Sequence, residues 1–168
     1  AVYRVALLIP MATSVLPISV AATDFVMNSA RKRNPRALRN YMFGYWKTFG
    51  VLSVLSLGAL WWMAPWLLAV FGPSYAEGAS VMRLFLVGSL GAHLLRVPYG
   101  HLLSAVGRAD LNTYVNGAVF LATIPLCFWA IPQWGIMGAA GVMAAMLWVS
   151  GGMYALVFEI HLRGQRQD

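Results

Sequence analysis

Three long stretches of this chain carry no charged side chain. Residues 5–23, 48–71 and 111–158 contain no Asp, Glu, Lys or Arg. A helix needs about 20 apolar residues to cross a bilayer, so each stretch is long enough for at least one crossing. Pro132 and Gly135 punctuate the last stretch and are expected to divide it into two helices.

The pattern predicts an all-α, polytopic transmembrane helical bundle with about five spans. The spans cover about residues 3–25, 46–70, 79–105, 112–131 and 136–159. Composition agrees with this class: 60% of the residues are hydrophobic and 10% are charged, whereas a soluble domain has about 25% charged residues. Pro98 is expected to kink the third span.

The twelve Lys and Arg residues predict how the spans are oriented. With residues 28–47, 107–110 and 161–168 in the cytoplasm, nine of the twelve lie on that side. Basic loops favour the cytoplasmic side, so we expect the N-terminus outside and the C-terminus in the cytoplasm. The net charge of +7 thus indicates topology. It does not indicate a nucleic-acid partner, which would need a basic face on a soluble module.

One arginine has no topological reason for its position. Arg96 lies four residues from the centre of the third predicted span, or about 6 Å from the midplane. An arginine at such depth costs about 2.5–3.5 kcal/mol and usually faces a cavity or a partner. His93, three residues earlier, is expected on the same helical face. We therefore expect Arg96 and His93 to bind an anionic ligand group such as a phosphate. The alternative is that backbone carbonyls near Pro98 satisfy Arg96.

Other candidates for chemistry are few. Asp24 is expected to cap the inner end of the first span, with ion coupling as the alternative. Cys127 is the single cysteine, so neither an internal disulfide nor a cysteine-based metal site is expected. We find no nucleophile triad, phosphate-cradling loop or cofactor motif, and expect neither a cofactor nor enzymatic activity.

Four short stretches resemble motifs of a known family. They are Leu16–Ser19 (Leu-Pro-Ile-Ser), Val70–Ala79 (Val-Phe-Gly-Pro-Ser-Tyr-Ala-Glu-Gly-Ala), Leu103–Arg108 (Leu-Ser-Ala-Val-Gly-Arg) and Trp134–Ala140 (Trp-Gly-Ile-Met-Gly-Ala-Ala). In order and spacing they resemble the C-terminal part of polysaccharide-biosynthesis flippases. These are the O-antigen and teichoic-acid exporters of the multidrug/oligosaccharidyl-lipid/polysaccharide superfamily.

The resemblance implies a specific biological setting. The chain would be part of one lobe of a two-lobed transporter in the bacterial inner membrane, surrounded by membrane lipids. Its partner would be an N-terminal lobe of the same protein, in keeping with a chain that opens on an apolar run without an initiator Met. The cargo would be an undecaprenyl-diphosphate-linked glycan, flipped between leaflets through a cationic cavity. No family motif assigns Arg96 to that cavity; its candidacy depends on its depth alone.

Two other functions stay open. A multidrug cation antiporter of the same superfamily would need carboxylates within the spans, and only Asp24 and Glu159, both near span ends, are available. A membrane enzyme of glycan assembly would need a substantial outer loop, whereas the predicted outer loops are short.

Overall fold

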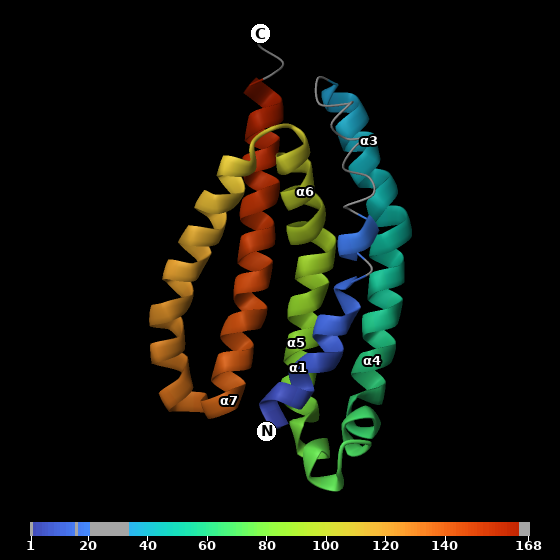
Figure 1. The fold of residues 1–168 in the computed structure, drawn as a ribbon, viewed down its shortest axis with the longest axis vertical. Helices are drawn as coiled ribbons and strands as arrows, with labels where there is room; N and C mark the ends of the chain where they lie inside the picture. Colours follow the sequence, from blue (N-terminus) through green and yellow to red (C-terminus); the bar gives the residue numbers. More distant parts are fainter. Residues whose placement is uncertain (1, 16, 21–33, 165–168) are drawn as a thin grey trace.

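The computed structural model describes residues 2–15, 17–20 and 34–164, and every regular element in these ranges is a helix (Figure 1). The protein is therefore an all-α bundle, as predicted. The elements are the α-helices α1 (Val2–Thr13), α3 (Pro35–Tyr45), α4 (Val51–Ala69), α5 (Ala79–Gly91), α6 (Val97–Ala105) and α7 (Ala109–Gly164), the π-helices η1 (Trp46–Gly50) and η3 (Ala92–Arg96), and the 3₁₀-helix η2 (Pro73–Gly78).

Within the described residues, four helical stretches are long and apolar enough to cross a membrane. They are Val2–Val20, Arg36–Ala69, Pro73–Ala105 and Ala109–Gly164. The last of these, α7, reverses direction at one residue (Figure 1). These stretches make membrane association the natural setting of the chain.

Gly135 causes the reversal of α7. Its φ of 56° and ψ of −132° lie outside the helical region, and glycine adopts a positive φ without a Cβ clash. Residues 109–134 and 136–164 therefore form two arms, each long enough for one crossing. The break was predicted to begin at residue 131, but the helix continues to residue 134. The two arms correspond to the fourth and fifth predicted spans.

The second span begins earlier than predicted. The second span was predicted to begin at about residue 46, but α3 starts at Pro35 and continues through η1 into α4. Asn34 is the N-cap, and its Oδ1 accepts a hydrogen bond from the backbone N–H of Ala37 at 3.1 Å. An asparagine N-cap followed by proline at N1 is a strong helix start, which explains the correction.

The third span matches its prediction closely. Together, α5, η3 and α6 run from Ala79 to Ala105, the predicted limits. In the first span, residues 21–25 and the candidate Asp24 lie outside the described residues.

The described parts of the predicted basic segments lie at one end of the bundle. The start of α3, the turn from α6 to α7 and the end of α7 lie together in Figure 1, while the turn from α4 to α5 and the reversal of α7 lie at the opposite end. At the first end, Arg39 of α3 forms an ion pair with Glu159 of α7. The orientation of the chain across a membrane stays a prediction.

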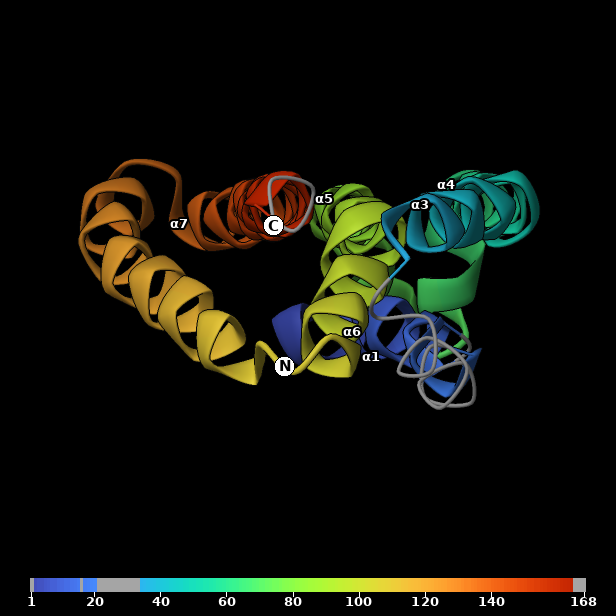
Figure 2. The same cartoon turned by 90° about the horizontal axis from the view of Figure 1, so that it is seen from above.

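The helices pack most closely where α5 and η3 meet the second arm of α7. Seen from above, α4, α5 and this arm lie in one row, with α1, α6 and the start of α7 on one side of it (Figure 2). A Cβ added to Gly151 would lie 2.7 Å from the Cβ of Leu95 and 3.2 Å from the backbone nitrogen of Arg96. Small residues permit such close helix contacts in lipid. The contact fixes the backbone that carries Arg96 against α7.

Candidate functional site

A π-turn precedes Pro98 in the third span. The backbone N–H of Val97 bonds to the carbonyl of Ala92, five residues earlier. Pro98 has no N–H. It therefore cannot donate to the carbonyl of His93, five residues earlier, as in a π-helix, or to that of Leu94, four residues earlier, as in an α-helix. Two carbonyls in the middle of the span therefore need donors from elsewhere.

Side chains of the neighbouring helix supply these donors. The hydroxyl of Tyr45, the last residue of α3, donates to the carbonyl oxygen of His93 at 3.0 Å. The indole N–H of Trp46, the first residue of η1, donates to the carbonyl oxygen of Leu94 at 2.8 Å. The alternative for Arg96 was that backbone carbonyls near Pro98 accept its hydrogen bonds. The bonds from Tyr45 and Trp46 argue against it, because the carbonyls at the kink already have side-chain donors.

Arg96 instead faces α7. Its Nη2 donates to Oδ1 of Asn116 at 3.1 Å. It forms no ion pair with any residue that the structure describes. Two of the described carboxylates already have partners: Glu159 pairs with Arg39, and Asp110 pairs with Arg108. No described carboxylate therefore compensates the charge of the guanidinium, and its other N–H groups can donate to a ligand.

Two adjoining pockets meet at Arg96 and Asn116. The first has a volume of about 300 Å³, lies between α6 and α7, and is rich in polar groups. The second, also about 300 Å³, lies between the two arms of α7 and is mostly apolar. Besides the two shared residues, His101, Ser104, Asn112 and Tyr154 supply the polar groups of the first pocket, and Val119, Phe120, Met143 and Leu147 are among the apolar residues of the second. We call the two pockets together the Arg96 groove.

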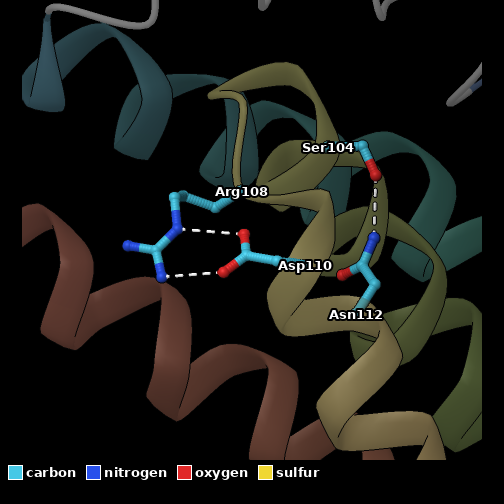
Figure 3. Close-up of polar contacts among 4 residues, drawn as sticks. All are labelled: Ser104, Arg108, Asp110 and Asn112. Atoms are coloured by element: carbon cyan, nitrogen blue, oxygen red, sulfur yellow. Dashed lines mark hydrogen bonds and ion pairs between the residues drawn. The ribbon is translucent and has the colours of Figure 1, made fainter.

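A hydrogen-bonded turn fixes the polar end of the Arg96 groove (Figure 3). Nδ2 of Asn112 donates to Oγ of Ser104 at 2.7 Å and to the carbonyl oxygen of Gly100 at 3.0 Å. Arg108 donates two hydrogen bonds of 3.0 and 3.1 Å to the carboxylate of Asp110, and these bonds raise the pKa of Arg108. The start of α7 is therefore held against α6, which places Asn116, one turn further along, beside Arg96.

The structure does not bring His93 and Arg96 together. His93 is 3% exposed and lines a cavity towards α1 and α4, whereas Arg96 lines the groove towards α7. A π-turn holds more residues than an α-turn, so residues three apart no longer lie above one another. The predicted shared face assumed α-helical geometry, which η3 does not have.

Arg83 differs from Arg96 in its partners. Its Nε donates to the carbonyl oxygen of Trp61 at 3.3 Å, and its guanidinium lies 5.6 Å from the centre of the Trp61 ring. Pro65, four residues after Trp61, leaves that carbonyl without its helical donor. Arg83 thus satisfies a backbone carbonyl that a proline leaves free, whereas Arg96 donates to the side chain of Asn116.

Sequence reasoning missed Asn112 and Asn116. Both lie in a stretch without charges, and their spacing of four places them on one face of α7. That pairing of amides in an apolar run was the available signal. Among the described residues, no group of three His, Cys, Asp or Glu side chains could hold a metal ion.

No protein-family model, curated protein or solved structure matches this chain. The family resemblance therefore depends on the four sequence stretches alone. In the structure, Val70–Ala79 includes the turn from α4 to α5, Leu103–Arg108 includes the turn from α6 to α7, and Trp134–Ala140 contains the reversal of α7. In Leu16–Ser19, the first residue lies outside the described residues.

Proposed function

We propose that this chain is part of a membrane transporter that flips lipid-linked oligosaccharides for surface polysaccharide assembly. One observation carries the proposal: Arg96, within the membrane-length helical stretch Pro73–Ala105, has no described acidic partner and lies where a polar pocket meets an apolar one. A lipid diphosphate has the same division into an anionic head and an apolar chain.

The chemistry of the Arg96 groove suits a phosphate. Arginine presents a planar fork of donors that matches phosphate oxygens, and such charge-assisted bonds are stronger than neutral ones. The amide of Asn116 orients the guanidinium, and the hydroxyl of Ser104 and the ring of His101 add polar contacts in the same pocket. The apolar pocket between the arms of α7 would accept the first part of a polyprenyl chain.

The remaining parts of the proposal follow the resemblance. The cargo would be an undecaprenyl-diphosphate-linked glycan, the setting a bacterial inner membrane, and the orientation N-terminus outside and C-terminus cytoplasmic. A further lobe of the same protein would complete the cavity. In this proposal the protein moves its cargo without catalysing a reaction.

The two alternatives have less support. A cation antiporter would need a free carboxylate in a span, but Glu159 is paired with Arg39 and Asp24 lies outside the described residues. An unpaired arginine in the groove would also repel a cationic drug. A glycan-assembling enzyme would need a large outer loop, whereas the described turn from α4 to α5 is the short helix η2.

The test is a flipping assay with the complete protein in proteoliposomes. Arg96→Gln keeps a donor for Asn116 but removes the charge, so we expect flipping of a fluorescent lipid-diphosphate oligosaccharide to fall at least about tenfold. Arg96→Lys should retain part of the rate. Arg163→Gln removes the same charge near the end of α7, outside the groove, and should leave the rate unchanged. Equal rates for wild type and Arg96→Gln would exclude Arg96 from the mechanism.

A further inference from the structure

A second cavity lies on the other side of the third span from the Arg96 groove. It has a volume of about 100 Å³ and is enclosed by residues of α1, η1, α4 and η3 together with Pro17. Its polar groups are the hydroxyls of Thr13, Ser53 and Ser56 and the imidazole of His93. We call it the His93 cavity.

The imidazole of His93 has an unsatisfied nitrogen. The residue is 3% exposed, and its Nε2 is buried without a hydrogen-bond partner among the residues that the structure describes. Buried polar atoms nearly always have a partner, and ordered water supplies it where the protein does not. A water molecule occupies about 30 Å³ of liquid, so the cavity has room for water beside Nε2.

Two of the hydroxyls that line the cavity are available as acceptors. Thr13 Oγ1 donates to the carbonyl oxygen of Pro10 at 2.7 Å, and Ser56 Oγ donates to that of Ser53 at 3.2 Å. The hydrogens of these two hydroxyls are thus used within their own helices, and each oxygen can still accept a hydrogen bond. A protonated imidazole is a donor at both nitrogens, and these oxygens and cavity water can accept from it.

The cavity also lies at a joint between two irregular helices. Tyr45 and Trp46, where α3 passes into η1, bond the carbonyls of His93 and Leu94 in η3. A Cβ added to Gly50 of η1 would lie 3.3 Å from Leu94. Single π-turns are frequent at functional sites, and here two of them adjoin one buried histidine.

We propose that the His93 cavity is a hydrated proton-binding site. A hydronium ion transfers its proton to the imidazole and leaves as water. The resulting imidazolium donates its single Nε2 hydrogen to a cavity water, and that water donates in turn to hydroxyl oxygens among those of Thr13, Ser53 and Ser56. This site is separate from the Arg96 groove, and its occupation requires no cargo.

Among the residues that the structure describes, no carboxylate lines the cavity, and the groups that can accept from the protonated ring are hydroxyls and water. No described residue of α4 is titratable. The titratable or charged groups on the other described elements packed around η3, and in the third span itself, are Tyr3 and Arg4 on α1; Arg36, Arg39, Tyr41 and Tyr45 on α3; Lys47 on η1; Arg83, Arg96, Tyr99 and His101 in the third span; and Asp110, Tyr114, Cys127, Tyr154, Glu159, His161 and Arg163 on α7.

The test follows the imidazole directly. The complete protein, labelled with ¹⁵N-histidine, is placed in lipid nanodiscs, and the ring signals of His93, His101 and His161 are recorded between about pH 8 and pH 4. The signals are assigned with His93→Gln or, if that variant does not fold, by elimination with His101→Gln and His161→Gln. We expect the His93 signal to titrate reversibly. A signal that stays neutral throughout, while another histidine titrates, would overturn the proposal.

Two further measurements separate a proton site from other readings. Adding sodium in place of choline at fixed pH should leave the His93 signal unchanged; a sodium-dependent shift would overturn the proposal in favour of a metal-cation site. Ser53→Ala removes one acceptor and should weaken proton binding about threefold to tenfold. Ser150→Ala removes another buried hydroxyl, which lies outside the cavity, and should have no such effect. Equal effects of the two variants would contradict the assigned cavity.

Discussion

The hydrogen bond from Trp46 to the third span leads to a quantitative prediction. Trp46→Phe removes the indole N–H that serves the carbonyl oxygen of Leu94 at 2.8 Å. It keeps an aromatic ring near Tyr99, whose ring centre lies 6.2 Å away. A lost hydrogen bond costs about 0.5–1.5 kcal/mol, and bonds between membrane helices average about 0.6 kcal/mol. Because the carbonyl has no helical donor, we expect a loss of about 1 kcal/mol in the free energy of unfolding.

A double-mutant cycle isolates the cause of this loss. Pro98→Ala provides a backbone N–H that can donate to Leu94, so in that background Trp46→Phe should cost about 1 kcal/mol less. Trp148→Phe is a matched control, since Trp148 is 37% exposed against 38% for Trp46. Its indole donates to the carbonyl of Val87, four residues before a glycine that keeps its N–H.

The assay is reversible unfolding in mixed lipid–detergent micelles, followed by far-ultraviolet circular dichroism. Two results would refute the reasoning. One is that Trp46→Phe costs as much free energy of unfolding in the Pro98→Ala variant as in the wild type. The other is a cost of Trp148→Phe as large as that of Trp46→Phe.

The remaining predictions concern helix packing and the inter-helix ion pair. Gly151→Ala should destabilise the protein by about 1–3 kcal/mol, because the new Cβ would lie 2.7 Å from Leu95. Gly152→Ala, which meets open space, should be neutral or stabilising by up to about 1 kcal/mol; equal effects in the same unfolding assay would contradict the packing of α7 against η3. Arg39→Ala should cost below about 1 kcal/mol, since the Arg39 and Glu159 side chains are 40% and 34% exposed. Exchanging the two charged residues should recover that loss at low salt, and no recovery would argue against the pair.

Hydropathy and punctuation predicted the helices well. The uncharged runs indicated the spans, and Gly135 marked the reversal of α7 to within a few residues. The third span has the predicted limits because its ends coincide with glycine- and proline-containing turns. The start of α3 was missed, although Asn34 and Pro35 are a recognisable capping pair.

The lateral arrangement of the helices was harder to predict. Lipid tails are as apolar as the side chains between packed helices, so hydropathy does not distinguish a packed helix face from a lipid-facing one. Asn116 was therefore not recognised as the partner of Arg96. The π-turn of η3 was equally hidden, because its cause lies in Pro98 together with donors from Tyr45 and Trp46, some 50 residues earlier. The separation of His93 from Arg96 follows from that turn.

The central claim is that the Arg96 groove binds an anionic lipid head group. Direct binding of a short-chain polyprenyl diphosphate to the complete protein in nanodiscs tests it, with the uncharged polyprenol as the control ligand. We expect Arg96→Gln to weaken binding of the diphosphate about tenfold to a hundredfold, as the loss of a charge-assisted hydrogen bond implies, and to leave binding of the polyprenol unchanged. Equal affinities of wild type and Arg96→Gln for the diphosphate would contradict the claim.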